Sequence, residues 1–294
     1  MRVSFLIFTY SGDELLTPLC VDFIKETVPE AKIYVVDDGF SAMNYPVRKR
    51  LEEAGVIYSQ SNWNRYGNLL GPDHLIGATK FMAQMAKSCD IIVKIDPDAC
   101  LIRRDWIDRL YEDPIALMTS SYKGRSCYPM GNSYAVKASV CKELAKDAEL
   151  YPGWVNCFED YEIGVRIARQ AKGDTSYSIR YESGIKGGFI LTNPWDMDYQ
   201  KVLNQVRVYC SGYSYGNLPP EKKLEYKNKQ VEVAINLLGY YRAAKKRENE
   251  DFVLDLPKKP EPMEVPEVVN VPPSAELAMK EIKGVLPEFS GSAA

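Results

Sequence analysis

The sequence predicts an α/β protein whose central sheet is mostly parallel and flanked by helices. Two observations predict it. Short apolar runs, typical of buried strands, alternate with segments in which apolar residues recur every three or four positions, typical of helices. Polar and acidic residues directly follow several of the apolar runs. Because the carboxyl ends of parallel strands meet at one edge of a sheet, we expect a ligand site at that edge.

The first hundred residues carry the clearest alternation. The predicted strands are 2–8, 31–40, 56–61 and 90–95, and the helices between them are 14–28, 47–55 and 73–88. This β-α-β rhythm favours parallel pairing with crossover helices.

The second half is mixed. Strands are predicted at 115–121, 132–137, 175–183 and 187–192, and helices at 137–150 and 159–173. The second of these helices begins with acids and ends at Gly173, as the helix dipole favours. Residues 221–249 form one long polar helix or two shorter ones, with a basic face that we expect to be solvated.

These patterns divide the chain into a main domain and two extensions. The main domain is expected over 1–215, in two halves at 1–100 and 101–215. A helical extension follows at 216–252. Residues 253–294 are rich in Pro and Glu, and we expect a flexible tail in which 274–286 could form a short helix.

Composition narrows the function classes. No apolar run approaches the roughly 18 residues of a membrane-spanning helix, and the N-terminal run is too short for a signal peptide, so a cytoplasmic protein is expected. Residues 1–250 are close to neutral and the last 44 are acidic, so there is no strong electrostatic footprint for nucleic acid. The seven cysteines form no CxxC pair and are expected to be reduced.

The single histidine, His74, excludes a metal site built from several histidines. A metal would be held mainly by oxygen, which favours Mg²⁺ or Mn²⁺ over Zn²⁺. His74 itself is expected to be a satisfied surface or core residue.

Candidate site residues follow three of the predicted strands. They are Thr9 and Tyr10 after the first, Asp37 and Asp38 after the second, and Asp96 and Asp98 after the fourth. On an extended backbone Asp96 and Asp98 point to the same side, and a divalent cation would relieve their repulsion. The alternative is that the two aspartates only cap a turn.

Four segments, in this order, resemble the family 2 glycosyltransferases of the GT-A fold. They are "YVVDDGF" (34–40), "IIVKIDPDACL" (91–101), "PMGNSYAVKASV" (129–140) and "NCFEDYEIGVRI" (156–167). The resemblance covers roughly residues 2–190. It implies a GT-A catalytic domain over 1–215, with a nucleotide-sugar half at 1–100 and an acceptor half at 101–215. It also implies transfer of a sugar from a UDP-like nucleotide donor to an acceptor hydroxyl, with inversion.

The resemblance also implies roles for individual residues. Thr9, Tyr10, Asp37 and Asp38 would contact the base or ribose of the donor, and Asp96 would lie near the ribose. Asp98, with Asp96, would hold Mn²⁺ or Mg²⁺ on the donor diphosphate. Asp160, next to Glu159, would be the general base; helix capping is the alternative role for this pair.

Two of the chain's departures from the family pattern concern the site. Phe40 stands where Ser or Thr usually follows the V-D-D-G motif, and no histidine follows His74 to serve as a late metal ligand.

Other functions and acceptors stay open. A sugar-phosphate nucleotidyltransferase would carry a glycine-rich basic loop after its first strand. The corresponding segment here, "TYSGDE" (9–14), has one glycine and no basic residue. A non-catalytic nucleotide-sugar-binding module is the other alternative. The acceptor is a glycan, a protein, a small molecule or a modified nucleobase in DNA, and the oligomeric state is open.

Overall fold

The computed structural model describes most of the compact unit Met1–Leu256. The described residues are 2–63, 72–112, 115–121, 129–150, 159–170, 178–181, 188–212, 215 and 218–247. The predicted tail at 253–294, its helix at 274–286, and the ends of several predicted segments (156–158, 171–177, 182–187 and 248–249) lie outside them.

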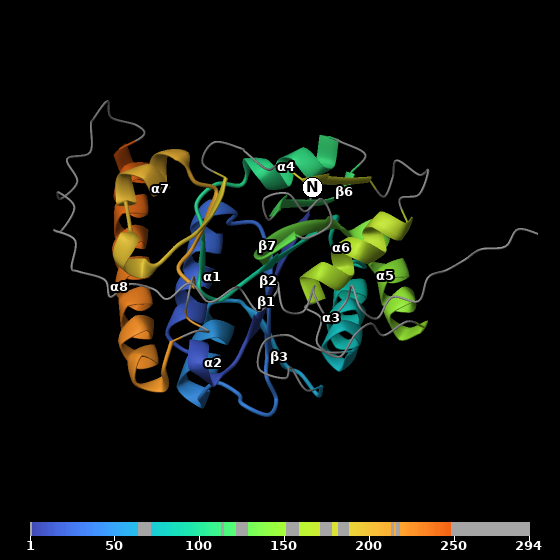
Figure 1. The fold of residues 1–294 in the computed structure, drawn as a ribbon, viewed down its shortest axis with the longest axis horizontal. Helices are drawn as coiled ribbons and strands as arrows, with labels where there is room; N and C mark the ends of the chain where they lie inside the picture. The colour runs from blue at the N-terminus through green and yellow to red at the C-terminus, as the bar shows by residue number, and fades with distance from the viewer. Residues whose placement is uncertain are drawn as a thin grey trace, which may run out of the picture. The chain divides into compact units, whose positions relative to one another are not determined.

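A seven-stranded sheet forms the centre of this unit, with the strand order β3-β2-β1-β4-β7-β6-β8 (Figure 1). The strands are β1 (Val3–Thr9), β2 (Lys32–Asp37), β3 (Ile57–Gln60), β4 (Ile91–Ile95), β6 (Ile115–Ser121), β7 (Pro129–Lys137) and β8 (Ser178–Tyr181). β7 is antiparallel to both of its neighbours, and the other pairs are parallel. The predicted mostly parallel sheet is therefore confirmed.

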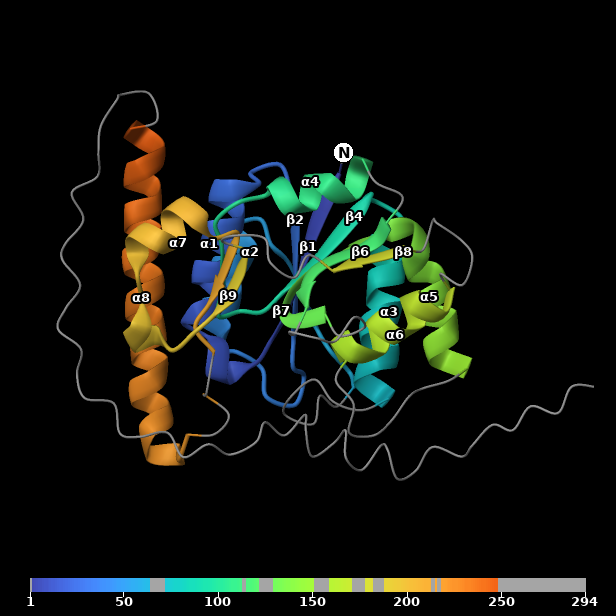
Figure 2. The same cartoon turned by 45° about the horizontal axis from the view of Figure 1, so that its top comes forward.

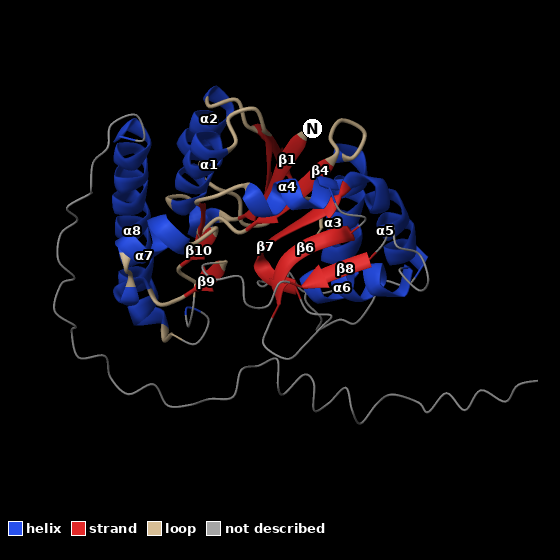
Figure 3. Ribbon diagram, turned by 90° about the horizontal axis from the view of Figure 1, so that it is seen from above, coloured by secondary structure: helices blue, strands red, loops and turns tan. Residues whose placement is uncertain are grey.

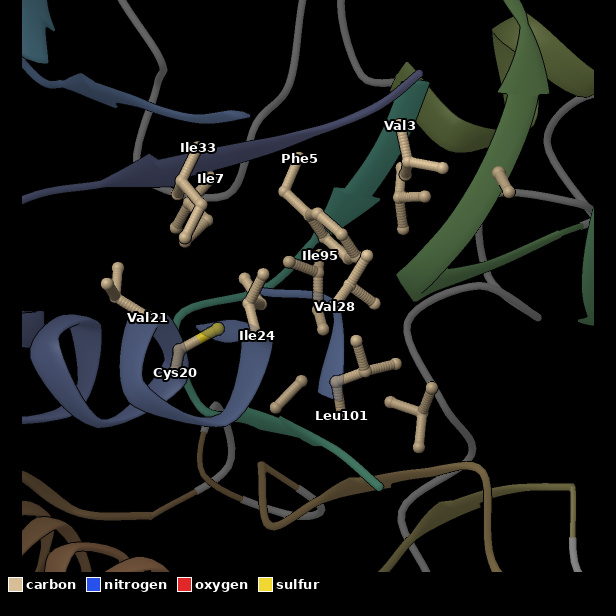
Figure 4. Close-up of a cluster of buried hydrophobic side chains, with 14 of the residues drawn as sticks. Val3, Phe5, Ile7, Cys20, Val21, Ile24, Val28, Ile33, Ile95 and Leu101 are labelled. Atoms are coloured by element: carbon tan, nitrogen blue, oxygen red, sulfur yellow. The ribbon is translucent and has the colours of Figure 1, made fainter. Parts of the chain in front are cut away.

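Helices cover both faces of the sheet (Figure 3). α1 (Leu16–Thr27), α2 (Tyr45–Glu53) and α4 (Asp105–Glu112) contribute to the apolar cluster on one face, which is drawn in Figure 4. α3 (Pro72–Met85), α5 (Ala138–Leu150) and α6 (Glu159–Gln170) contribute to the cluster on the other face. Successive residues of a strand point to opposite faces, so each central strand supplies both clusters.

A second, three-stranded sheet lies beside the first (Figure 2), with the order β5 (Ala99–Leu101), β10 (Val208–Cys210) and β9 (Phe189–Leu191). β10 is antiparallel to β5 and parallel to β9. Neither β5 nor β10 was predicted, because three residues are too few to show a period. This sheet turns the chain immediately after Asp98 and holds it against residues 208–210.

The long polar segment forms one helix, α8 (Pro220–Arg247), preceded by α7 (Tyr199–Gln205). One stripe of α8, which includes Tyr226, Val233 and Leu237, is buried, and Leu237 joins Phe23 of α1 in a third apolar cluster. Figures 1 and 2 show α8 running beside α1. Among the described helices, α8 included, none combines the length and the apolar character needed to cross a membrane.

The packing of α8 predicts that two leucines on this helix differ in how much stability is lost when each is replaced by alanine. Leu237 is fully buried, whereas 71% of Leu224 is exposed. We expect Leu237→Ala to lower the free energy of unfolding by about 2–4 kcal/mol, and Leu224→Ala by less than about 0.5 kcal/mol. Urea unfolding of both variants measures this difference. Equal costs would mean that α8 does not pack as described.

Candidate active site

A buried lysine, Lys94 of β4, lies at the centre of the candidate site. Its side chain is 1% exposed, and its ammonium lies 2.6 Å from Oδ1 of Asp96 and 3.6 Å from Oε1 of Glu159. It also donates a hydrogen bond to the carbonyl oxygen of Gly131. Burial alone would lower the pKa of Lys94, but Asp96 and Glu159 together raise it, so the side chain is protonated at neutral pH.

The register of the sheet explains why Lys94 meets these partners. Lys94 lies between Leu6 of β1 and Tyr134 of β7, in the middle of the sheet. The Tyr134 hydroxyl donates to Oε1 of Glu159 at 3.3 Å. Two strands and the first turn of α6 therefore meet around one ammonium group.

Asp160 lies beside Glu159 in the first turn of α6, with 5% of the residue exposed. Its Oδ1 accepts the backbone N–H of Tyr161 at 2.8 Å. Its Oδ2 lies over Gly131, where an added Cβ would approach to 2.5 Å, so a side chain at position 131 would push the carboxylate away. The glycine at the start of β7 thus makes room for Asp160.

Burial, and then the charge of Glu159, raises the pKa of Asp160 to about 8, with Lys94 opposing the shift. Burial also raises the pKa of Glu159, against the charge of Lys94. At a pKa of about 8, the Asp160 carboxyl group holds its proton near neutral pH and is a stronger base than an ordinary carboxylate once ionised.

Asp96 and Asp98 do not lie on an extended backbone, so the prediction that rested on strand alternation was wrong. β4 ends at Ile95, and the backbone N–H of Ala99 bonds back to the carbonyl oxygen of Asp96 at 3.0 Å, so Asp98 lies in a turn and not on an extended strand. Asp96 thus turns to Lys94, and Asp98 turns to the second sheet and α8.

The second sheet and α8 hold Asp98 on the far side of the turn. Cys210 donates to its Oδ1 at 3.4 Å, and Nε2 of Gln230 donates to its Oδ2 at 3.2 Å. A Cβ on Gly212 would lie 2.5 Å from Oδ2, so glycine is needed there too. Burial, followed by the charge of Asp96, raises the pKa of Asp98 to about 6.

Asp37 and Asp38 organise the loop after β2. Oδ2 of Asp37, which is fully buried, accepts the backbone N–H of Met43 at 2.8 Å and the hydroxyl of Tyr58 at 2.6 Å. Burial raises the pKa of Asp37, and its Oδ1 accepts no hydrogen bond from a described group. Oδ1 of Asp38 accepts the backbone N–H of Phe40 at 3.0 Å, and its carboxylate remains partly accessible.

The two residues after β1 differ in environment. Thr9 is buried, and its hydroxyl lies 2.7 Å from that of Thr17, inside the molecule. Tyr10 is partly exposed and its ring lies over Gly12, where a Cβ would approach to 2.5 Å. Of the pair, only Tyr10 presents its side chain toward solvent.

The predictions for histidine and cysteine can be compared with the described residues. His74 is buried in α3, and its Nδ1 accepts the indole N–H of Trp63 at 3.1 Å, as expected for a satisfied histidine. The described cysteines are all buried and free, namely Cys20, Cys89, Cys100, Cys141 and Cys210.

The donor chemistry of the acidic residues fits a hard divalent cation. Asp96 raises the pKa of Asp98, which means that the two carboxylates repel each other and that a cation would relieve the repulsion. Buried Oε1 of Gln230 accepts no hydrogen bond from a described group. In the described part of the chain, no three His, Cys, Asp or Glu side chains form a group that could hold a metal ion.

Several site residues were missed from the sequence. Lys94 carried a signal, because a lysine within the run IIVKI is unusual in a buried strand. Asp13, Lys227 and Gln230 carried none, because α8 lies more than 200 residues after the β1 loop in the sequence and only the fold brings them together.

No family model matches the chain, and no curated protein matches its sequence. Among solved structures, it is similar to the galactosyltransferase LgtC in complex with donor and acceptor sugar analogues (TM-score 0.45, 12% identity, 80% of this chain and 96% of that chain covered). It is also similar to the mannosyltransferase PcManGT from Pyrobaculum calidifontis in complex with GDP-Man and Mn²⁺ (TM-score 0.45, 15% identity, 97% and 81% covered). At these values neither likeness supports an inference about activity, donor or metal.

Replacing Lys94 is expected to destabilise the protein strongly. Lys94→Met leaves the buried carboxylate of Glu159 and the partly exposed carboxylate of Asp96 without their cation. Loss of one partner costs about 3–5 kcal/mol in buried ion pairs. The matched control is Lys80→Met, because Lys80 and Glu149 form a half-exposed ion pair worth at most about 1 kcal/mol. Chemical unfolding at pH 7.5 compares the two. If both variants lost the same free energy of unfolding, the Lys94 ammonium would not be stabilising the two carboxylates as described.

Replacing Asp160 is expected to stabilise the protein at high pH. Folding raises the pKa of this carboxyl from 3.8 to about 8, so between these values the native state holds a proton that the unfolded chain releases. The wild type therefore loses stability as the pH rises through this window, and an asparagine does not.

We expect Asp160→Asn to gain little at pH 4 and roughly 2–5 kcal/mol at pH 8.5, measured as the free energy of unfolding across that range. A difference that does not change with pH would contradict the raised pKa.

Proposed function

We propose that this chain is a metal-dependent glycosyltransferase of the GT-A type, similar to family 2, that moves a sugar from a nucleoside diphosphate donor to an acceptor hydroxyl with inversion. The observation that carries the proposal is that the carboxyl groups of Asp98 and Asp160 lie near the end of β4 with different hydrogen-bond partners. Asp98, with a pKa near 6, is ionised at neutral pH, whereas Asp160, with a pKa near 8, is poised to exchange a proton.

Asp160 is the proposed general base. Its Oδ1 is held by the backbone N–H of Tyr161, so Oδ2 is the oxygen that accepts the proton of the acceptor hydroxyl. Glu159 stays bound to Lys94 and Tyr134 and positions the first turn of α6. A positioned base of this kind typically contributes 10²–10⁴-fold to the rate.

The donor is proposed to lie along the carboxyl ends of β1, β2 and β4. Asp98, with Asp96, would hold Mn²⁺ or Mg²⁺, which when bound stabilises charge on the leaving diphosphate. Tyr10 and Asp38, which are partly exposed, are the proposed contacts to base and ribose. Asp37 and Thr9, whose side chains are buried, would support these loops from beneath.

The compartment is proposed to be the cytoplasm. Five cysteines are buried and free among the described residues, and thiols persist in reducing compartments.

The proposal predicts that nucleotide binding and turnover are lost in different variants. Asp98→Ala should abolish the thermal shift that a nucleoside diphosphate gives with Mn²⁺, because a metal ligand is lost. Asp160→Asn should keep that shift and lower turnover by about 10²–10⁴-fold. The measurements are thermal unfolding with a panel of nucleoside diphosphates and nucleotide sugars, with and without Mn²⁺, and release of nucleoside diphosphate.

The control is Asp90→Asn, at the opposite end of β4, where Asp90 pairs with Arg2 on the surface. This variant should behave as the wild type in both measurements. Full turnover by Asp160→Asn would remove Asp160 as the base, and a panel without any shift would overturn the donor class.

A further inference from the structure

A second lysine, Lys227 of α8, reaches the same edge of the sheet. Its ammonium lies 2.6 Å from Oδ1 of Asp13, in the turn after β1. The Asp13 side chain is 8% exposed and that of Lys227 is 18% exposed. The pair joins segments 214 positions apart in the sequence.

The groups around Lys227 belong to the proposed donor side. The ammonium lies 4.7 Å from the centre of the Tyr215 ring, and the charges of Asp13 and Asp98 outweigh burial in raising the pKa of Lys227. Gln230, three positions further along α8 and on the same side of it, donates to Asp98. Lys227 and Gln230 therefore approach Asp98 from one face of one helix.

Two observations indicate that this place takes a ligand. Gln230 is 1% exposed, yet its Oε1 accepts no hydrogen bond from any described group. The Lys227 ammonium carries three N–H donors, and Asp13 needs only one of them. A partly exposed cation and a buried acceptor without a described donor thus lie on the same face of α8, near Asp98.

An accessible cation favours an anionic ligand. Among the described residues, Lys94 and Lys227 are cations beside the carboxyl groups of Asp13, Asp96 and Asp98. A diphosphate here needs a cation that it can reach. Lys94 is 1% exposed and bound to Asp96, whereas Lys227 is partly accessible. Ammonium–phosphate hydrogen bonds are also stronger than bonds between neutral groups.

We propose that Lys227 binds the diphosphate of the donor and that Asp13 competes with the diphosphate for the Lys227 ammonium. This inference rests on the proposed function, because it assumes a nucleoside diphosphate donor. It goes beyond that function by making α8 part of the donor site. No bond is made or broken, since Lys227 keeps one N–H on Asp13 and directs the others to phosphate oxygens.

The simplest alternative is that the Asp13–Lys227 pair only fastens α8 to the turn after β1. Two variants of the full chain separate these roles. Lys227→Met removes the cation, and Asp13→Asn removes the competing anion but leaves the cation. A fastening role predicts the same loss from both, whereas a diphosphate-binding role predicts opposite effects on anion affinity.

The experiment measures dissociation constants by calorimetry in the presence of Mn²⁺. The ligands are UDP, GDP, inorganic pyrophosphate, uridine and guanosine. We expect Lys227→Met to weaken the preferred nucleoside diphosphate and pyrophosphate by about tenfold or more, which corresponds to about 1.4 kcal/mol, and to leave the nucleoside within about twofold. Asp13→Asn should bind both anions at least as tightly as the wild type.

Lys222→Met is the matched control, because Lys222 is exposed on the same helix. It should leave every constant unchanged, and Lys227→Arg, which keeps the charge, should recover part of the diphosphate affinity if Lys227→Met does not fold. Unchanged diphosphate binding by Lys227→Met, or equal losses in Lys227→Met and Asp13→Asn, overturns the inference alone. A wild type that binds none of the nucleotides overturns both this inference and the proposed donor class.

Discussion

The rest of the site depends on the burial of one ammonium group. Lys94 lies in a central strand, between Leu6 and Tyr134, where an uncompensated charge would be very costly. Compensation comes from the carboxylates of Asp96 and Glu159. The end of β4 and the start of α6 must therefore lie close together, and these are the two segments that carry the candidate metal ligands and the candidate base.

The same constraint separates the two acids that flank Pro97. Asp96 is drawn to Lys94, and the turn sends Asp98 toward β10 and α8. Asp96 and Asp98 then have different partners. Asp160, in α6, has a third environment, and the charges that act with burial to raise its pKa differ from those that act on Asp98. Acid groups that sit close together but titrate differently are a common basis for dividing metal binding and proton transfer within one cleft.

The features that could be predicted from the sequence are those that depend on a local pattern of residues. Apolar runs identified β1, β2 and β4, and the acids at their ends could be placed at one edge because parallel strands share a direction. The orientation of Asp98 could not be predicted, because the three-residue strand β5 begins directly after it and gives no periodic signal. The pairing of Asp13 with Lys227 was equally hidden, since it depends on how α8 packs and on no motif near either residue.

The packing of α8 couples this helix to the candidate site of the central sheet. Its buried stripe places Leu237 against α1 in a third apolar cluster, and this contact fixes the rotation of the helix about its own axis. Because residues three and four apart share a face, the same rotation turns Gln230 toward Asp98 and Lys227 toward Asp13. The apolar packing of α8 therefore orients Lys227 and Gln230 at the edge of the sheet where Asp13 and Asp98 lie. A change in that packing is expected to alter anion binding as well as stability.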